Sequence, residues 1–474
     1  MLKIYNTMTQ KKEVFTPIEP GKIGMYVCGV TVYDYCHIGH ARVTVSFDVI
    51  TRYLRAAGYD VKYVRNITDV DDKIFNRANE NGEPYDQLTQ RFIDAMHEDE
   101  RSLNILPPTL EPRATHYMAD IINLVATLVE KGVAYPAENG DVYYAVEKFA
   151  DYGKLTNRKT EDLLAGARVE VNEFKRNPLD FVLWKAAKSG EESWASPWGE
   201  GRPGWHIECS AMSTQCLADT FDIHGGGPDL PFPHHENEIA QSEAATGHQY
   251  VNYWMHAGAV RVNQEKMSKS LGNFFTIREV LEKYHPEEIR YFLISSHYRS
   301  PINYSEQSLQ TARANLLRFY TALRDAPVAP LDESRQGQHK DNENCQAYRL
   351  RFNEAMDDDF NTPEAIAVMY DMVREINKLR EAQPGLAVLL VEELKALGGI
   401  LGVLQEQPDR FIQRGSGADE EGGFTAKVEA LIEKRLAARL AKDWGAADAT
   451  RDQIADLGVE LEDRPDGKTI WRRV

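Results

Sequence analysis

Residues 23–67 read IGMYVCGVTVYDYCHIGHARVTVSFDVITRYLRAAGYDVKYVRNI, and this stretch decides the fold. Residues 23–28 are a short apolar run, which predicts a buried strand. Residues 37–57 carry apolar side chains at helical spacing, and Gly58 favours the end of that helix. Residues 61–67 are a second apolar run. Strand, helix and strand within this length predict a βαβ unit with parallel strands, which bind ligands at their carboxyl ends.

The sequence after this unit predicts that the same sheet continues much later in the chain. Residues 221–223 and 251–256 have the apolar character of further strands. Residues 113–204 separate them from the first unit and include a strand-like run at 141–146. We therefore expect an α/β protein with a Rossmann-type catalytic domain over residues 1–303, into which residues 113–204 are inserted.

The last third of the chain has long helical periodicity. Two polar segments rich in proline and glycine, residues 326–344 and 405–423, read as linkers. They predict a helical bundle over residues 304–404 and a small C-terminal domain over residues 424–474. The most apolar stretch, residues 386–404, is interrupted by charged side chains and reads as an amphipathic core helix.

The composition is that of an ordinary globular protein, with 42% hydrophobic and 27% charged residues. Neither a signal peptide nor a membrane span is recognisable, so a cytoplasmic protein with no membrane partner is expected. The net charge of −18 argues against non-specific binding to nucleic acids. The five cysteines are too sparse for a disulfide framework. Each one is by itself most simply a buried small side chain, with metal binding as the alternative.

Two short motifs have the character of a phosphate site. His37-Ile38-Gly39-His40 lies where the first strand leads into its helix, and a helix N-terminus offers backbone N–H groups and a partial positive charge. Its simpler interpretation is a pair of surface histidines. Lys266-Met267-Ser268-Lys269-Ser270 suits a mobile loop that closes on a polyphosphate, although an exposed basic loop would look similar.

Together these motifs are the pair of signatures of class I aminoacyl-tRNA synthetases. The chain resembles the cysteinyl-tRNA synthetases of the compact bacterial type from end to end. Residues 25–34, 66–74, 201–212 and 224–241 also match that family. The resemblance implies a ligase that uses Mg-ATP to form cysteinyl-adenylate and then transfers cysteine to tRNA(Cys), and it suggests a monomer.

The resemblance also assigns roles to individual residues. The catalytic set is His37, His40, Lys266 and Lys269; the ATP-binding set is His37, Gly39, His40, Asp229 and Lys269; the substrate-binding set is Gly29, Thr68 and Trp205. Two of these roles stay open. Asp229 could hold a ribose hydroxyl or the substrate ammonium group, and Trp205 could instead be a packing anchor.

The resemblance implies a set of zinc ligands as well: Cys28, Cys209, His234 and Glu238. These are acceptable ligand types, and His234 and Glu238 share one helix face at i, i+4 spacing. Without the resemblance, buried thiols and a helix-face pair are the simpler interpretations. One zinc ion per chain would distinguish cysteine from serine, because zinc binds a thiolate well whereas an alcohol is a weaker ligand.

Other residues near the expected site have more modest interpretations. His206, His224, His235 and His256 are expected to support the site rather than to react, and Cys36 is expected to pack in the core. At the C-terminus, residues 469–474 combine Trp471 with two arginines. They could stack on unpaired tRNA bases, or Trp471 could be buried in a terminal strand.

Three other functions fit parts of the sequence. A mycothiol-pathway ligase would share the catalytic half but lack the C-terminal domain. A non-catalytic tRNA-binding protein would not need both signature motifs and all four zinc positions. A zinc hydrolase is disfavoured because the sequence has no H-E-x-x-H helix.

Overall fold

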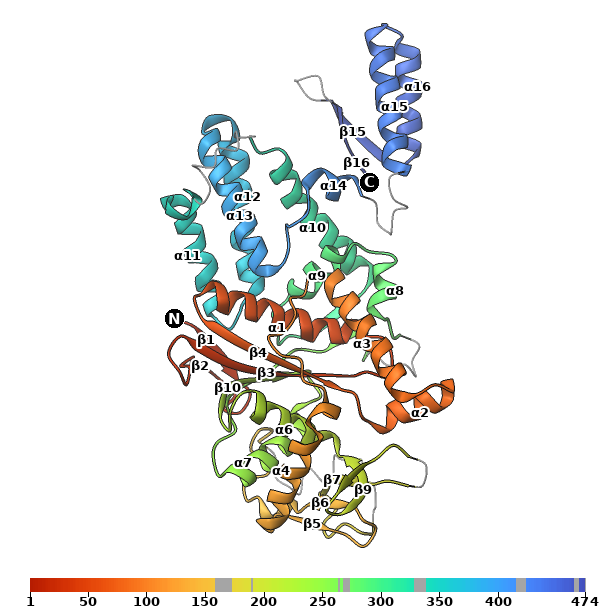
Figure 1. Ribbon diagram of the computed structural model, residues 1–474. Helices are drawn as coiled ribbons and strands as arrows, with labels where there is room; N and C mark the ends of the chain where they lie inside the picture. Colours follow the sequence, from red (N-terminus) through yellow and green to blue (C-terminus); the bar gives the residue numbers. More distant parts are fainter. Residues whose placement is uncertain are drawn as a thin grey trace. The chain divides into compact units, whose positions relative to one another are not determined.

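The protein is seen here in a computed structural model, which describes residues 1–157, 173–188, 191–262, 265–266, 273–327, 338–414, 423–463 and 469–473. The chain forms two compact units (Figure 1). The first comprises Met1–Phe274, Ser296–Asn303 and Glu354–Thr362, and the second comprises Phe275–Ser295, Tyr304–Asn353 and Pro363–Val474. The predicted site residues that the structure describes all belong to the first unit.

A four-stranded parallel sheet forms the centre of the first unit. Its order is β11 (Val251–His256), β10 (Phe221–Gly226), β3 (Lys22–Thr31) and β4 (Asp60–Thr68). Every neighbouring pair is parallel. The predicted βαβ unit and the two later strands are therefore confirmed. Strands from both ends of the unit's sequence meet in one sheet, so their carboxyl ends lie along one edge.

Helices cover both faces of this sheet. Helix α1 (Ile38–Ala56) lies on one face, and α6 (Trp205–Cys216) and α7 (Glu236–Thr246) lie on the other (Figure 1). His37 is the N-cap of α1, and Gly58 has a φ of 95°, which explains why the helix ends where the sequence predicts. The buried ring of Phe47 on α1 fills the space that a side chain on Gly225 of β10 would need.

Strand β3 has an irregularity that the sequence did not reveal. We expected the strand to end at Cys28, but it continues to Thr31, with a register shift between Val27 and Val30. A bulge of this kind re-aims a side chain locally. Gly29 is required here because a Cβ atom would lie 1.7 Å from the backbone oxygen of Asn66.

The segment between the two halves of the sheet forms an antiparallel sheet of its own. Its order is β5 (Ala134–Pro136), β6 (Val142–Tyr144), β7 (Phe181–Ala186), β9 (Gly199–Pro203) and β8 (Trp194–Ser196). Helix α4 (Met118–Glu130) packs with it and with α6 around a core that includes Trp184 and Ile207. Short turns of 3₁₀-helix at Ala114–Tyr117 and Val146–Lys148 flank these elements.

The other elements lie around these sheets or form the second unit. Strands β1 (Lys3–Asn6) and β2 (Lys11–Val14) pair as a hairpin, and β13 (Glu265–Lys266), β12 (Val260–Val262) and β14 (Ile302–Tyr304) form a small sheet. Helices α2 (Asp72–Asn81) and α3 (Tyr85–Ser102) follow β4. The second unit contains α8 (Ile277–Leu281), α9 (Pro286–Ile294), α10 (Glu306–Arg324), a 3₁₀ turn (Gln338–Asp341), α11 (Glu343–Asp357), α12 (Thr362–Ala382), α13 (Pro384–Leu401), α14 (Pro408–Gln413), α15 (Gly423–Leu440) and α16 (Trp444–Asp456).

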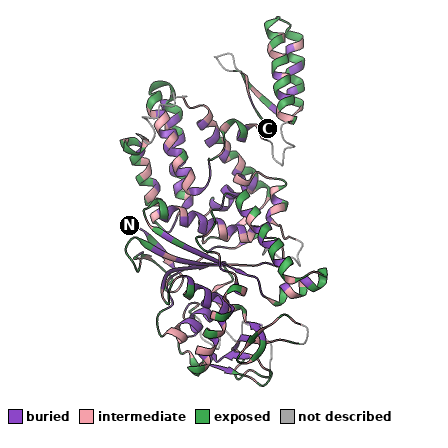
Figure 2. Cartoon of the chain, in the orientation of Figure 1, coloured by how far each residue is buried: buried purple, intermediate pink, exposed green. Residues whose placement is uncertain are grey.

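The end of the chain is a hairpin of β15 (Val459–Asp463) and β16 (Thr469–Arg473). Trp471 is 3% exposed and packs with Val428, Ile432 and Ile454. Figure 2, which is coloured by burial, shows that α15 and α16 carry both buried and exposed residues. The Trp471 ring therefore cannot stack on a tRNA base, and the interpretation as a buried residue of a terminal strand is the correct one.

A buried ion-pair network holds α3 and the following loop against β4. The guanidinium of Arg65 lies 2.7 Å from Glu100 and 2.8 Å from Glu111, and His97 contacts the other oxygen of Glu111 at 2.6 Å. The two carboxylates and His97 are also spaced closely enough to hold a metal. Because Arg65 already pairs with both carboxylates, we interpret this cluster as structural.

Replacing Arg65 with leucine should destabilise the protein strongly. The change leaves two largely buried carboxylates without their cation, and breaking a buried pair in this way costs about 3–5 kcal/mol. Denaturant titration should show this loss in the free energy of unfolding. Arg101→Leu, on the exposed face of α3, is the control and should have little effect. Equal stability of the two variants would contradict a stabilising role for the network.

Candidate metal and nucleotide site

The four residues predicted to bind zinc come together at the carboxyl end of the central sheet. Cys28 lies at the bulge of β3, and Cys209 on α6. His234 lies in the π-helical turn Pro231–His235, and Glu238 in the first turn of α7. All four are buried, and their ligand atoms lie within 4.8 Å of one another. The Sγ atoms of Cys28 and Cys209 are 3.8 Å apart, and His234 Nε2 is 3.0 Å from Glu238 Oε1. His234 thus faces Glu238 as predicted, although it precedes the α-helix.

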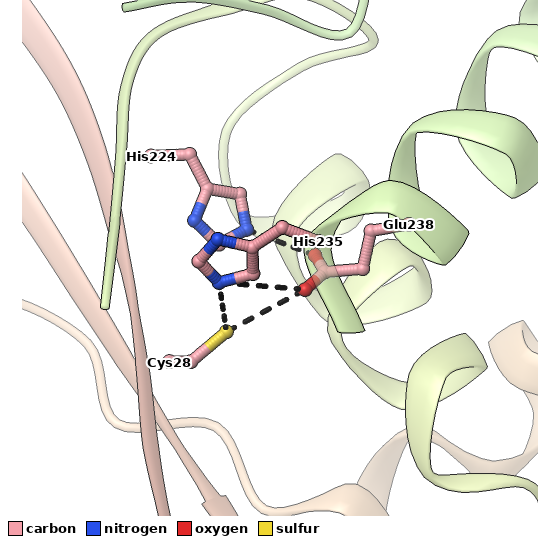
Figure 3. A group of neighbouring side chains, drawn as sticks. All are labelled: Cys28, His224, His235 and Glu238. Atoms are coloured by element: carbon pink, nitrogen blue, oxygen red, sulfur yellow. Dashed lines mark hydrogen bonds and ion pairs between the residues drawn. The ribbon is translucent and has the colours of Figure 1, made fainter. Parts of the chain in front are cut away.

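A second group of potential ligands shares two of these residues. Figure 3 shows His224 and His235 beside Cys28 and Glu238. His235 Nε2 lies 3.4 Å from Cys28 Sγ, and His224 Nε2 lies 2.8 Å from Glu238 Oε2. From the sequence, both histidines were expected near the site in a supporting role. The structure places them in direct contact with the predicted ligands.

The two carboxylate oxygens of Glu238 have different partners. Oε2 accepts hydrogen bonds from the hydroxyl of Tyr250 at 3.1 Å and pairs with His224. Oε1 instead faces Cys28 Sγ at 3.5 Å and His234. Tyr250 and His224 therefore hold the carboxylate so that Oε1 points to the group that contains both thiols.

The ionisable groups of this cluster act strongly on one another. Burial raises the pKa of Glu238, but His224 and His234 outweigh it and hold that pKa well below its usual range. Burial lowers the pKa of His234, yet Glu238 and Cys209 raise it to about 10. A hydrogen bond from Cys28 lowers the pKa of Cys209 to about 6, whereas burial raises the pKa of Cys28. The anionic Glu238 and Cys209 thus offset a protonated His234 in a buried site, and a metal ion would bind there by displacing that proton.

These residues fit a metal ion. Among the described residues, buried His234 Nε2 makes no well-oriented hydrogen bond despite its short distance to Glu238, and a shared cation would resolve this situation. Two thiols, an imidazole and a carboxylate are the ligand types of tetrahedral zinc. The cluster could therefore hold a metal, and its thiols favour a soft one.

Two of the predicted substrate residues, Trp205 and Gly29, adjoin predicted metal ligands, and Thr68 is linked to Gly29 through Asn66. Trp205 opens α6, is 40% exposed and stacks on the His234 ring with a centroid distance of 4.1 Å. Thr68 is buried at the end of β4 and accepts a hydrogen bond from Asn66, and Asn66 also accepts one from the backbone of Gly29. Trp205 is too exposed to be a core anchor, and it lies over a predicted metal ligand.

The two histidines of the first signature motif form a stacked pair at the start of α1, with ring centroids 3.6 Å apart. His37 Nδ1 accepts hydrogen bonds from the backbone of Gly39 and His40, and His40 Nδ1 accepts one from the backbone of His37. We expected these backbone N–H groups to face phosphate, but the His37 cap already binds two of them. In both neutral rings the proton therefore lies on Nε2, which makes that atom the donor.

The remaining predicted residues are described only in part. Asp229 is exposed in the turn that follows β10. The backbone of Lys266 lies in β13, but its side chain is outside what the structure describes, and so is the whole of Lys269.

Two groups next to the cluster, one phenol and one carboxyl group, were not singled out from the sequence. Tyr250 holds Glu238, as described above. Glu208 is buried directly before Cys209, and burial together with Cys209 and Asp71 raises its pKa well above the usual range. The position of Glu208 beside a predicted ligand was a signal that could have revealed it. Tyr250 carries no such signal, because only the fold brings it to Glu238.

The chain matches three family models in sequence order. Residues 14–314 match the catalytic domain of the class I (C) tRNA synthetases, residues 351–405 match the DALR domain, and residues 421–472 match the anticodon-binding domain of cysteinyl-tRNA ligases. The chain belongs to the cysteine–tRNA ligase family. The family and the enzyme class predicted from the sequence are therefore confirmed.

Known cysteine–tRNA ligases resemble this chain over its whole length. The protein from Stutzerimonas stutzeri (strain A1501) is 62% identical over 99% of both chains. A protein of the same name from Pseudomonas aeruginosa (strain LESB58) is 61% identical over 100% of this chain and 99% of its own.

More distant solved structures show the same fold. Mycobacterium tuberculosis methionyl-tRNA synthetase with methionyl-adenylate has a TM-score of 0.55 at 15% identity and covers 85% of this chain and 96% of its own. The Agrobacterium radiobacter LeuRS–tRNA–LeuAMS complex has a TM-score of 0.55 at 13% identity, over 94% and 95% of the two chains. The predicted α/β class, with a parallel sheet followed by helical parts, is confirmed. No helix within the described ranges has the length and apolar character to cross a membrane.

Removing the hydroxyl of Tyr250 should weaken metal binding. Tyr250→Phe takes away one of the two groups that hold Glu238 Oε2, and loss of such an outer contact lowers metal affinity about 10–100-fold. Competition with a chromophoric chelator would measure the zinc affinity. Tyr253→Phe is the matched control, because that hydroxyl contacts the backbone of Val14 and Thr16 and not the cluster. Equal zinc affinities for both variants would contradict the assigned role of Tyr250.

Proposed function

We propose that this chain activates L-cysteine with Mg-ATP and transfers it from cysteinyl-adenylate to tRNA(Cys), and that a zinc ion recognises the substrate thiol. One observation carries the proposal. Two buried thiols, an imidazole and a carboxylate converge at the carboxyl end of a parallel sheet, which is where α/β folds bind their ligands.

Of the two overlapping groups, the one with Cys28, Cys209, His234 and Glu238 is the better zinc site. It has two thiols instead of one, and Glu238 directs Oε1 to it while Oε2 is engaged elsewhere. A zinc ion held there would supply a soft Lewis acid that prefers the sulfur of cysteine to the oxygen of serine. The exposed indole of Trp205 stacks on His234 and could close the pocket over the substrate.

The nucleotide site is proposed to lie at the start of α1. His37 and His40 would donate hydrogen bonds from Nε2 to phosphate oxygens, and Gly39 between them has no side chain to obstruct the ligand. Lys266 and Lys269 would stabilise the pyrophosphate as it leaves. The substrate carboxylate attacks the α-phosphate directly, so these residues act by position and charge, with no covalent enzyme intermediate.

The other substrate contacts and partners are part of the same proposal. Thr68 and Gly29 would line the amino-acid pocket beside Trp205, and Asp229 would bind either a ribose hydroxyl or the ammonium group. The C-terminal domain over residues 424–474 would bind the tRNA anticodon, following a helical bundle over residues 304–404. A cytoplasmic monomer with one zinc ion per chain completes the proposal.

The thiol-reading site predicts a large preference for cysteine over serine that depends on Cys209. ATP–pyrophosphate exchange should be supported by cysteine and not by serine, and removal of metal by a chelator should abolish it. Cys209→Ser should lower the amount of bound zinc because a thiolate ligand is lost. The cysteine-dependent rate should fall with it, by about a hundredfold or more. Cys345→Ser, a buried cysteine far from the cluster in sequence, is the control. Normal discrimination by Cys209→Ser would rule out this role.

Loss of the signature lysine should slow the first step of the reaction. Lys269→Ala should reduce cysteine-dependent pyrophosphate exchange about a hundredfold or more, the usual effect of removing one charge-stabilising donor. The KM for cysteine should change little, because Lys269 is assigned to the leaving pyrophosphate. Lys283→Ala, an exposed lysine on the same stretch of chain, should leave the rate unchanged. An unchanged rate for Lys269→Ala would contradict the assignment.

A further inference from the structure

Glu208 on α6 is a buried acid that lacks the partners other buried acids have. Glu208 is 1% exposed, and its Oε2 atom has no hydrogen-bond partner among the described residues. By contrast, Asp222 accepts hydrogen bonds from the backbone of Ile18 and Gly24, and Glu236 accepts them from the backbone of residues 153–156. A buried carboxylate oxygen without a partner is costly unless a ligand completes it.

The surroundings of Glu208 are acidic. Burial raises the pKa of Glu208, nearby Cys209, Asp71 and Asp69 raise it further, and a hydrogen bond with Thr68 opposes them. The other two carboxylates are already used: Asp69 accepts two hydrogen bonds from Thr115, and Asp71 caps α2 through the backbone of Lys73. A positively charged ligand group at the carboxyl end of β4 would oppose this rise in the pKa and give Oε2 a partner.

The position of Glu208 relative to the metal cluster suggests which ligand group this is. Glu208 directly precedes Cys209, and helix α6 packs against β4, which ends at Thr68. In cysteine the sulfur and the ammonium nitrogen are three bonds apart, a separation of about 3 Å. A substrate whose thiol lies at Cys28 and Cys209 thus carries its ammonium group within reach of the residues next to Cys209.

We propose that Glu208 binds the α-ammonium group of the substrate through Oε2. The Thr68 hydroxyl holds the carboxyl group of Glu208 in place. The inference rests on the proposed function, and it adds a second selection beside the thiol. The metal cluster would select a sulfur, and Glu208 would select an amine attached two carbons away. Asp229, which is exposed, is then the residue for the ribose hydroxyl.

The test compares cysteine with 3-mercaptopropionate, which has the thiol and the carboxylate but no ammonium group. The KM for cysteine is measured by pyrophosphate exchange, and the Ki of 3-mercaptopropionate by competition in the same assay. In Glu208→Gln, which keeps the shape of the side chain, the KM should rise about tenfold or more, since hydrogen bonds to charged groups are the strong ones. The Ki of 3-mercaptopropionate should stay the same or fall. A parallel rise of both constants, or an unchanged KM, would overturn the proposal.

Two further measurements separate recognition from a structural defect. Glu200→Gln removes an exposed acid from β9 and should change neither constant, and zinc content and melting temperature should be the same in both variants. The wild-type protein gives an independent result, because it should bind 3-mercaptopropionate at least tenfold more weakly than cysteine. Equal binding of the two would exclude an ammonium site. If the wild type failed to activate cysteine at all, the proposed function itself would be wrong, whereas an active wild type with equal binding would refute the role of Glu208 alone.

Discussion

The buried carboxylate of Glu238 is the group on which the rest of the site depends. Burying an anion is costly, and this one is tolerated because Tyr250 and His224 bind one oxygen while His234 lies beside the other. These three partners come from β10, from the turn before α7 and from the segment just before β11, so the carboxylate also fixes those parts of the chain relative to one another. Cys28 then faces Oε1, and a set of ligands for a soft cation is assembled (Figure 3).

The parallel sheet makes this assembly possible. Cys28 is 181 residues from Cys209 in the chain, yet their sulfur atoms are neighbours. Strand β3, which carries Cys28, lies inside the sheet, directly between β4 and β10. Cys28, in the bulge of β3, contacts Cys209 of α6 and Glu238 of α7, and Gly29 allows the bulge to form against Asn66. Helices α6 and α7 lie on the lower face of the sheet in Figure 1. A cluster of donors so far apart in sequence is stable only because the strands hold their carboxyl ends at one edge.

The same geometry divides the recognition of a small amino acid among separate groups. Sulfur, ammonium and carboxylate are attached to adjacent carbons, so their binding groups must lie within a few ångströms of one another. In this protein the candidates are the thiol-rich cluster for the sulfur and Glu208 with Thr68 for the ammonium group, whereas the stacked histidines at the start of α1 are proposed for the phosphates of ATP. Helix α6 contributes to the first two, through Cys209 and Glu208.

Local patterns in the sequence were sufficient for the elements and for the family. Apolar runs and a terminal glycine predicted β3, α1 and β4 within a few residues, and the two signature motifs indicated the enzyme class. Only the tertiary structure decided how the candidate groups are used. It showed that His37 caps its own helix, that Trp471 is buried and that His235 contacts Cys28. It also showed that Oε2 of Glu208 has no hydrogen-bond partner among the described residues. The physical reason is that periodicity reports which face of an element is buried, whereas hydrogen bonding and charge depend on neighbours that folding brings from distant parts of the chain.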